Sequence, residues 1–497
     1  MVKIDGENLS VDDVWAVAVE KEKVELADAA RKRMQESRRV LLRLVEGDEP
    51  VYGVTTGIGE FAGVRVDKKF AEEMQMRIVR SHAVSNGEPL SPEIVRAAML
   101  LRANSLAKGF SGVRVELVER LLEFLNEGIV PVVYNKGSIG ASGDLTQLAQ
   151  MSLPLIGEGE VFSSGERLPA IFVLRRKRME PLSLSYKEGL ALINGCQVMT
   201  GIGAVVVMRA RNLLDSFLRI SALTIEVLGG KREPFDDRIH KVRPFQGQLF
   251  VAKRITELLS GSSLTDTKRN GKVQDAYSIR CLPQVVGAFF DVLEYVGKII
   301  TVEINSAVDN PLIFPEEEKI LSGGNFHGEY VALALEYLTL VLADLSTFAE
   351  RHINRLLNPA LSGLPAFLTA DGGLNSGLML LQYSIADLVA ENKLLSHPAV
   401  VDSIPVSADQ EDHMSMGGTS ARKLVQVLEN TETVVAAQLI AAAQGVEFVE
   451  KNTLSPAGIS LYDKLREMVK PLDKDRVLYR ELENVTEALR DGRFRSV

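Results

Sequence analysis

A set of long helices, each with a continuous apolar stripe, is the feature that most constrains how this chain folds. Between Glu329 and Leu357, apolar residues recur at spacings of three and four, which predicts one buried face along a helix on the order of 40 Å long. Asn358-Pro359 is expected to end it. Similar patterns occupy residues 198–228, 285–304, 376–395 and 418–445. Helices this long and apolar exceed what one small core needs, so the sequence predicts a helical bundle that also packs against other subunits.

The first 200 residues follow a different pattern, with shorter helices and short extended segments. Helices are expected over residues 11–46, 69–83, 91–107 and 112–127, and a few short strands over residues 158–186. No linker or fixed-period repeat divides the chain. We therefore expect a mainly α fold, in which a smaller mixed N-terminal domain (residues 1–200) precedes a long-helix bundle domain (residues 201–497).

The composition excludes several classes of protein. Of 497 residues, 57 are basic and 66 acidic, and the formal charge of −9 argues against nucleic acid as a partner. Two cysteines, Cys196 and Cys281, are too few for a disulfide scaffold or a cysteine-rich zinc site, and they fit a reducing compartment. The most apolar segments, near residues 331–345 and 434–446, are shorter than the ~18 residues that suggest a membrane span. We expect a cytoplasmic protein without a membrane segment.

The stretch from Gly137 to Asp144, Gly-Ser-Ile-Gly-Ala-Ser-Gly-Asp, admits two interpretations. It could be a flexible turn in which Ser142 or Asp144 caps the following helix. Alternatively, a tight bend would let the amide nitrogen of Gly143 attack the carbonyl carbon of Ala141 and close a five-membered ring. Loss of water from the ring and from the Ser142 side chain would then leave a methylidene group conjugated to an imidazolone. That product is an electrophile, which no ordinary side chain provides.

Polar clusters between the predicted helices are the other candidate sites. They are Ser81-His82, Asn194 to Gln197, Gln274 to Arg280, Gly323 to His327, and Gln410 to His413. In the third cluster, a spacing of three would place Gln274, Tyr277 and Arg280 on one side of a helical turn. Taken alone, each cluster also fits a helix cap or a surface turn. No two histidines have the spacing of a zincin helix, so no metal site is expected.

Taken together and in this order, the motifs resemble those of the aromatic amino acid ammonia-lyases and aminomutases. That family forms a 4-methylidene-imidazol-5-one (MIO) electrophile from the tripeptide that Ala141-Ser142-Gly143 matches, and the resemblance covers nearly the whole chain. The other matching motifs are Tyr52-Gly-Val-Thr-Thr-Gly, Ser81-His82-Ala83, Leu192-Ile193-Asn194-Gly195, Gln274 to Arg280, Asp309-Asn310-Pro311 and Gly324-Asn325-Phe326-His327. Within the family, Gln410-Glu411-Asp412-His413 is similar to the histidine ammonia-lyase form.

The resemblance implies a carbon–nitrogen lyase that eliminates ammonia from L-histidine and gives trans-urocanate. Its MIO would form autocatalytically from Ala141-Ser142-Gly143, with no external cofactor. The implied catalytic side chains are Tyr277 as the candidate base, Tyr52 as a second candidate, and Glu411. The implied substrate-binding residues are His82, Asn194, Gln274, Arg280, Phe326 and Met379. Members of the family assemble each site from several subunits, so a homotetramer is expected.

Two alternatives stay open at this stage. The first keeps the electrophile but changes the substrate or product, as in a tyrosine or phenylalanine ammonia-lyase or an aminomutase. Since His82 is shared with relatives that use tyrosine, the preference for histidine depends on Glu411 and its neighbours. The second alternative is an inert helical scaffold in which the Ala141-Ser142-Gly143 loop stays unprocessed.

Overall fold

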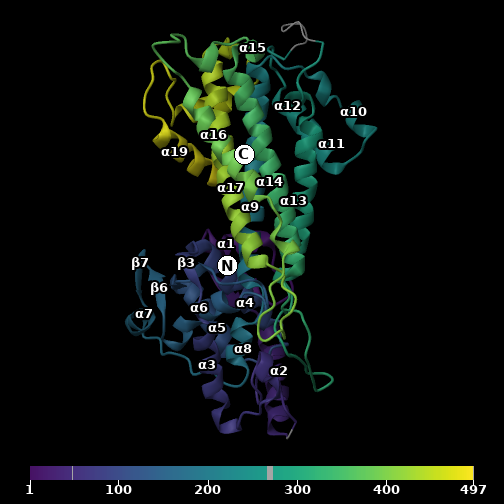
Figure 1. Cartoon of the computed structure of the whole chain (residues 1–497), viewed down its shortest axis with the longest axis vertical. Helices are drawn as coiled ribbons and strands as arrows, with labels where there is room; N and C mark the ends of the chain where they lie inside the picture. The colour runs from purple at the N-terminus through teal and green to yellow at the C-terminus, as the bar shows by residue number, and fades with distance from the viewer. Residues whose placement is uncertain (48, 266–272, 496–497) are drawn as a thin grey trace. The chain divides into compact units, whose positions relative to one another are not determined.

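The computed structural model describes residues 1–47, 49–265 and 273–495, and these form two compact units (Figure 1). The first unit contains residues 1–208, 296–336 and 398–422. The second contains residues 209–295, 337–397 and 423–497. Sequence analysis places one domain boundary near residue 200, whereas each unit here is built from three separate segments. The predicted boundary at residue 200 therefore does not correspond to the division between these two units, and it stays a prediction.

The first unit begins with a short strand, and then has two helices and a second strand where the sequence predicts a single helix over residues 11–46. The elements are β1 (Val2–Ile4), α1 (Val11–Ala18), β2 (Val24–Leu26) and α2 (Asp28–Glu46). The single-helix prediction is wrong because the chain leaves the helical conformation at Lys21, which has a φ of 61°. The alternating segment Val24-Glu25-Leu26 then pairs in parallel with β1 and buries Val24 and Leu26.

The next helices of the first unit follow the predicted pattern closely. They are α3 (Ala71–His82), α4 (Pro92–Ala107) and α5 (Val115–Glu127). Gly128 ends α5 in the left-handed conformation, with a φ of 67°, which glycine adopts without steric cost. Shorter helices complete this part of the chain: α6 (Leu145–Ser152), α7 (Ala170–Lys177) and α8 (Glu188–Ile193).

The remaining strands of the described residues are short. Strand β3 (Asn86–Pro89) pairs antiparallel with β5 (Tyr134–Lys136). A three-stranded antiparallel sheet has the order β4 (Val130–Pro131), β6 (Glu160–Ser163) and β7 (Glu166–Pro169). Strands β8 (Leu312–Phe314) and β9 (Lys319–Leu321) form a hairpin. None of these sheets is large enough to form a core by itself, so the helices carry most of the burial.

Four long helices contribute residues to both units. They are α9 (Gln197–Val227), α13 (Leu282–Ile304), α14 (Glu329–Leu357) and α17 (Gly417–Val446). Helix α14 has the predicted bounds, and Val331, Leu335, Leu338 and Leu342 of its apolar stripe are fully buried. The other helices of the second unit are α10 (Asp237–Lys241), α11 (Gln246–Leu258), α12 (Tyr277–Arg280), α15 (Pro359–Ser362), α16 (Met379–Leu395), α18 (Pro456–Arg466) and α19 (Tyr479–Arg490).

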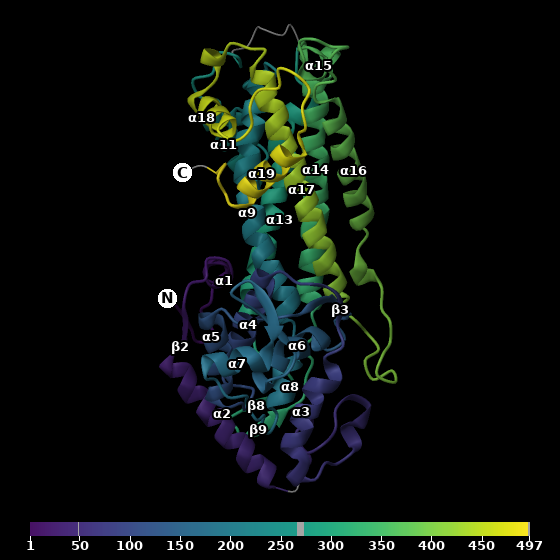
Figure 2. The same ribbon diagram turned by 90° about the vertical axis from the view of Figure 1, so that its left-hand side faces the viewer.

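Within the second unit, α9, α14, α16 and α17 lie alongside one another in both views (Figures 1 and 2). Buried polar contacts fix their register. Gln438 of α17 donates its amide hydrogens to Thr224 of α9 at 3.1 Å and to the His352 Nδ1 of α14 at 2.8 Å. Burial lowers the pKa of His352 to about 4, so this imidazole is neutral near pH 7 and accepts that bond. The mainly α bundle predicted from the sequence is confirmed.

Helix α14 also has the length and hydropathy of a membrane span. Its 18-residue window has a mean hydropathy of 1.6, so the estimate that this apolar segment falls short of 18 residues is too low. However, 56% of that window is buried inside the protein, as in the core helix of a soluble protein. Among the residues that the structure describes, no other helix meets these criteria.

Candidate active site

A cavity of about 890 Å³ in the first unit brings together seven of the residues predicted for the site. Its walls come from segments far apart in the sequence, namely the loops around residues 52–62, 141–145, 322–327 and 407–413 together with the ends of α3 and α8. The seven predicted residues on these walls are Tyr52, His82, Ala141, Ser142, Asn194, Phe326 and Glu411. The cavity therefore juxtaposes the Ala-Ser-Gly loop with polar side chains from five other segments.

The Ala-Ser-Gly loop is bent tightly back on itself. Gly143 forms β-bridge pairs with both Gly140 and Ala141, and a third with Gly195. Gly140 and Gly143 each have a φ of 75°, which favours glycine. A Cβ atom on Gly143 would lie 2.1 Å from the Gly195 oxygen, so only glycine fits here. The bend thus keeps the Gly143 backbone beside that of Ala141, as ring closure between these residues would require.

Asp144 anchors the C-terminal end of this loop from a fully buried position. Its Oδ2 accepts the backbone N–H groups of Val198 at 3.0 Å and Met199 at 2.9 Å, which belong to the first turn of α9. Its Oδ1 accepts the Ser138 hydroxyl at 3.1 Å. Burial raises the pKa of Asp144 to about 6, although these hydrogen bonds lower it. The carboxylate satisfies N–H groups that α9 cannot satisfy internally, and so ties the loop to that helix.

Arg102 holds the segment that faces the loop. This fully buried side chain of α4 donates to the carbonyl oxygens of Ala191 at 2.5 Å and Asn194 at 2.9 Å, and it also bonds the Gln197 side chain. Burial lowers the pKa of Arg102 to about 10, so the guanidinium remains charged near pH 7. One arginine therefore connects the last turn of α8 to the start of α9 and fixes the backbone of Asn194 between them.

Two side chains contact Ser142 directly. The Asn194 side-chain amide donates to the Ser142 carbonyl oxygen at 3.1 Å. From the opposite end of the sequence, Glu411 accepts the Ser142 hydroxyl through Oε1 at 3.3 Å. Ser142 and Glu411 are 269 positions apart in the chain. The structure thus places an amide donor and a carboxylate on the residue that the sequence assigned to the electrophile.

His82 and Tyr52 have defined hydrogen-bonding states in the cavity wall. The Nδ1 of His82 lies 2.8 Å from the Ile78 carbonyl oxygen, and because a carbonyl can only accept, Nδ1 carries the hydrogen. In this tautomer the lone pair lies on Nε2. The Tyr52 hydroxyl accepts the Gly59 backbone N–H at 3.0 Å, which leaves its own hydrogen available. His82 and Tyr52 therefore offer the cavity an imidazole acceptor and a phenol donor.

Phe326 is held from behind by a buried thiol. The Cys196 Sγ–H donates to the Phe326 carbonyl oxygen at 2.9 Å. Burial raises the pKa of Cys196 well above its usual range, so the thiol stays protonated and can donate. The cysteine has a packing role here, and its reactivity is suppressed.

The other predicted site residues, Gln274, Tyr277, Arg280 and Met379, belong to the second unit. Tyr277 begins the one-turn helix α12 and is 70% exposed, and Met379 begins α16. The Arg280 guanidinium lies over the Tyr277 ring, 4.4 Å from its centroid. Gln274 precedes α12, so the prediction that Gln274, Tyr277 and Arg280 share one helical turn is wrong for the glutamine.

Sequence reasoning missed several residues that shape the site. Arg102 lies in the apolar helix α4 and carries no motif signal, although a charged residue in such a run is itself unusual. Ser415 limits the space at Gly140, where a Cβ atom would lie 2.0 Å from the Ser415 Oγ. Ser138 lies in the glycine-rich stretch without a role that the sequence indicates, and its hydroxyl donates a hydrogen bond to Asp144.

The comparisons with known proteins agree on the family. The sequence profile of the aromatic amino acid lyases matches residues 9–467. A histidine ammonia-lyase from Caldanaerobacter subterraneus subsp. tengcongensis is 48% identical over 496 residues, which cover 100% of this chain and 98% of that protein.

Solved structures give the same result. A histidine ammonia-lyase from Trypanosoma cruzi has a TM-score of 0.92 and 41% identity, covering 99% of this chain and 94% of that one. A tyrosine aminomutase from Streptomyces globisporus has a TM-score of 0.96 and 40% identity, covering 99% and 97%. The family model and the histidine ammonia-lyase relatives indicate a carbon–nitrogen lyase. The chain belongs to the aromatic amino acid lyase family, as its resemblance predicted.

Proposed function

We propose that this enzyme is a histidine ammonia-lyase, which eliminates ammonia from L-histidine and releases trans-urocanate. The observation that carries the proposal is the contact between the Ser142 hydroxyl and the Glu411 carboxylate at 3.3 Å. It places a carboxylate beside the carbon that would become the electrophile. An imidazole can donate to such a carboxylate, whereas a phenyl ring has no polar group to pair with it. The names of the curated relatives support the same substrate.

We infer that Ala141, Ser142 and Gly143 form an MIO group in this chain. The residues fit the group because the bend keeps Ala141 and Gly143 together and the glycine positions tolerate no side chain. Once formed, this group would supply an electrophilic methylidene carbon for the substrate amine. No external cofactor enters the proposal.

Asn194 would stabilise charge during the reaction. In the closed ring the Ser142 carbonyl oxygen would be conjugated to the methylidene carbon, so this oxygen is where negative charge would develop. The Asn194 amide already donates to it at 3.1 Å, and Asn194 is only 4% exposed. A donor fixed in advance in a water-poor site stabilises such charge more than solvent does.

Glu411 and His82 would recognise the imidazole of the substrate. The Glu411 carboxylate can accept one ring N–H, while the lone pair on the His82 Nε2 can accept another donor. Both residues line the same cavity as Ser142. Phe326 would support the electrophile ring from the cavity wall, and Met379 would contact the imidazole from a different segment.

A tyrosine would remove the poorly acidic β-proton of the substrate. Tyr277 is our candidate, with Tyr52 as the second. The Arg280 guanidinium lies over the Tyr277 ring, 4.4 Å from its centroid, and would hold the phenol in place. Arg280 and Gln274 would bind the substrate carboxylate, since a guanidinium can contact a carboxylate through two parallel bonds.

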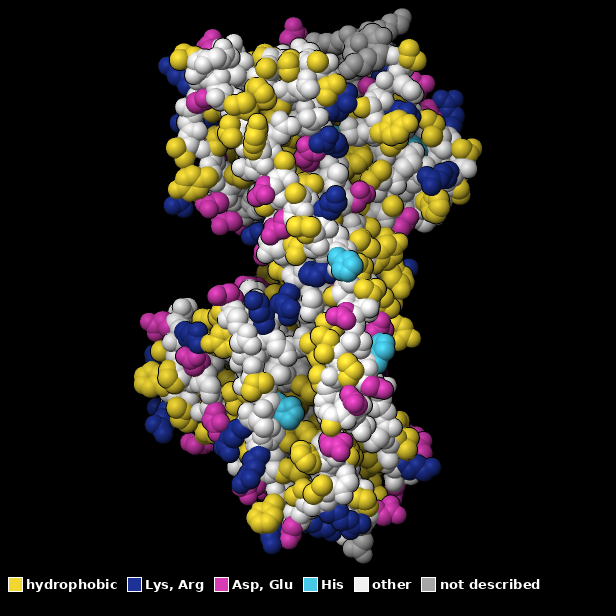
Figure 3. Space-filling view, in the orientation of Figure 1, with side chains coloured by type: hydrophobic (Ala, Val, Ile, Leu, Met, Phe, Trp, Pro, Cys, Tyr) yellow, Lys and Arg dark blue, Asp and Glu magenta, His cyan; other side chains and the backbone are white. Residues whose placement is uncertain are grey.

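We further propose that the enzyme is a cytoplasmic homotetramer with shared active sites. Large apolar side chains are exposed on the long helices, including Tyr330, Leu333 and Tyr337 of α14 and Leu380, Tyr383 and Leu394 of α16. Figure 3 shows hydrophobic side chains at many places on the surface of the second unit. Other subunits would cover these surfaces, and a neighbouring chain would bring its Tyr277 to the cavity described above.

Three measurements test these proposals. Intact-protein mass should show a deficit of two waters that Ser142→Ala abolishes, and a wild type of full mass would exclude the electrophile. Ultraviolet absorbance of the product measures turnover. The rate with L-histidine should exceed the rates with L-tyrosine and L-phenylalanine. The reverse order would favour a tyrosine or phenylalanine lyase or an aminomutase.

The third measurement mixes two inactive variants, Ser142→Ala and Tyr277→Phe, by co-expression. If each site takes its electrophile and its base from different chains, random mixing restores about a quarter of the sites. Sites built within one chain would stay inactive in every mixture. Each variant expressed alone serves as the control.

A further inference from the structure

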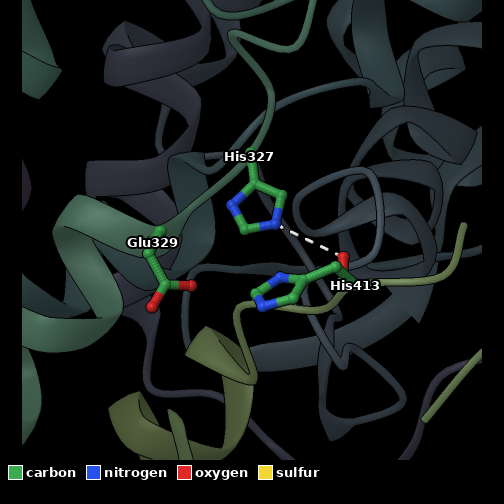
Figure 4. A group of neighbouring side chains, drawn as sticks. All are labelled: His327, Glu329 and His413. Atoms are coloured by element: carbon green, nitrogen blue, oxygen red, sulfur yellow. Dashed lines mark hydrogen bonds between the residues drawn. The ribbon is translucent and has the colours of Figure 1, made fainter. Parts of the chain in front are cut away.

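Three potential metal ligands converge in the first unit, and none of them is assigned a role in the proposed reaction. They are His327, Glu329 and His413, and their ligand atoms all lie within 4.8 Å of one another (Figure 4). His327 and Glu329 come from the segment that starts α14, while His413 comes from the loop before α17. The two imidazole rings are 5.6 Å apart between centroids and tilted by 35°. Figure 4 shows the Glu329 carboxylate beside the two rings.

The His327 ring is held in the orientation that a metal ligand needs. Its Nε2 lies 3.3 Å from the His413 carbonyl oxygen, and because a carbonyl can only accept, Nε2 carries the hydrogen. The Nδ1 atom then has the free lone pair, and Figure 4 shows this second ring nitrogen facing the side of Glu329. Metal-bound histidines commonly donate their other N–H to a backbone carbonyl in this way, which fixes the tautomer.

Glu329 supplies an unpaired carboxylate oxygen. Its Oε2 is shielded from solvent, and among the described residues no group forms a hydrogen bond with it. A buried oxygen of an ionised carboxylate is costly to leave without a partner. Together with the two nearby histidines, this oxygen makes a set of ligand atoms that suits a metal cation.

We propose that His327, Glu329 and His413 form a binding site for a divalent transition metal of the zinc class. Two imidazole nitrogens and one carboxylate oxygen are a common ligand set for zinc, with a fourth position left for water or another small ligand. Ligands on a tetrahedral zinc lie roughly 3.4 Å apart, at about 2.0–2.1 Å from the metal. The ligand atoms lie within 4.8 Å of one another, and we expect rotation of the exposed His413 side chain to close this spacing.

Metal binding at this site would affect the cavity, because His327 and His413 line it. His327 follows Phe326 directly, and His413 is two residues after Glu411. A bound metal would therefore tie the segment of Phe326 to the loop of Glu411. This inference does not depend on the proposed substrate, since it rests on the three ligands alone.

The test is a binding measurement on the full-length protein without an oligohistidine tag. Apoprotein prepared with a chelator is dialysed against Zn²⁺, and in parallel against Co²⁺, whose visible absorption reports a tetrahedral site with nitrogen ligands. L-Histidine is omitted because it chelates these metals itself. We expect one metal ion per chain and a raised melting temperature with Zn²⁺, because the ligand binds only the folded state.

Ligand variants and one matched control decide the outcome. His413→Ala and Glu329→Gln should each weaken Zn²⁺ binding by about 100-fold or more and abolish the thermal shift. His397→Gln removes another exposed histidine of the chain and should bind as the wild type does. If Glu329→Gln fails to fold, His413→Ala on the exposed loop still gives the answer. Absence of stoichiometric binding to the wild type, or equal binding by wild type and His413→Ala, would overturn the proposal, whatever substrate the enzyme prefers.

Discussion

Asn194→Ala isolates the hydrogen bond that we assign to charge stabilisation. The substitution removes the side-chain amide that lies 3.1 Å from the Ser142 carbonyl oxygen. The backbone of Asn194 should keep its place, because Arg102 binds its carbonyl oxygen and not its side chain. The effect should therefore be confined to the donor.

The expected magnitude follows from the burial of this donor. Asn194 is 4% exposed, so solvent cannot readily replace the lost hydrogen bond. Removing one preorganised donor from a site of this type lowers kcat by about 100- to 1,000-fold, or about 3–4 kcal/mol of transition-state stabilisation. KM for L-histidine should change little, because the bond strengthens only when charge develops.

The assay needs a check on the electrophile and a control for stability. Asn194 does not contact the atoms that close the ring, so intact-protein mass should still show the loss of two waters. Asn126→Ala is the matched control, since the Asn126 side chain makes two hydrogen bonds of 2.9 Å to the backbone of Val24. It should lower thermal stability without lowering kcat.

Two results would refute the reasoning about Asn194. If the variant carries the complete mass deficit and its kcat falls by less than about tenfold, the amide does not stabilise the reaction as proposed. A variant that lacks the deficit would show instead that Asn194 is needed to form the electrophile, and the assigned role would again be wrong.

Three further predictions concern the loop and its neighbours. Gly143→Ala should abolish the mass deficit, because its Cβ would lie 2.1 Å from the Gly195 oxygen, and mass spectrometry checks this. Glu411→Gln should severely reduce turnover of L-histidine while retaining the mass deficit; largely intact turnover would contradict the role in recognition. Burial raises the pKa of Asp144 from 3.8 to about 6, so its protonated form is favoured by folding. The stability of the wild type relative to Asp144→Asn should therefore be highest below about pH 4 and fall by about 3 kcal/mol as the pH rises through about 6, which melting temperatures at one protein concentration can follow.

The long helices were predictable because their signals are local. Helix α14 begins and ends as predicted, since its apolar stripe is continuous and Asn358-Pro359 stops it. The prediction of one helix over residues 11–46 failed because the structure there depends on a contact between residues distant in the sequence. Strand β2 is stabilised by pairing with β1 about twenty residues earlier, and helical periodicity on either side of it conceals this pairing.

The candidate site was predictable as a set of residues but not as a set of contacts. Motif resemblance supplied Ser142 and Glu411, yet only the structure places them 3.3 Å apart. Arg102 could not be found because it acts through backbone carbonyls, which leave no pattern in the sequence. The expectation of no metal site considered only the spacing of histidines within one helix. His327 and His413 come from two distant segments, so this criterion cannot detect them.

The buried charges around the loop explain how its bend is maintained. Asp144 and Arg102 are both fully buried, and burial shifts the pKa of each toward its neutral form, to about 6 and about 10. Shifts of this size correspond to roughly 3 kcal/mol of destabilisation for each ionised group relative to its neutral form. What apolar residues cannot do is bind the first turn of α9 and the carbonyl oxygen of Asn194 at fixed positions. The two buried charges therefore cost stability, but they fix the backbone of the loop in which Gly143 must stay beside Ala141.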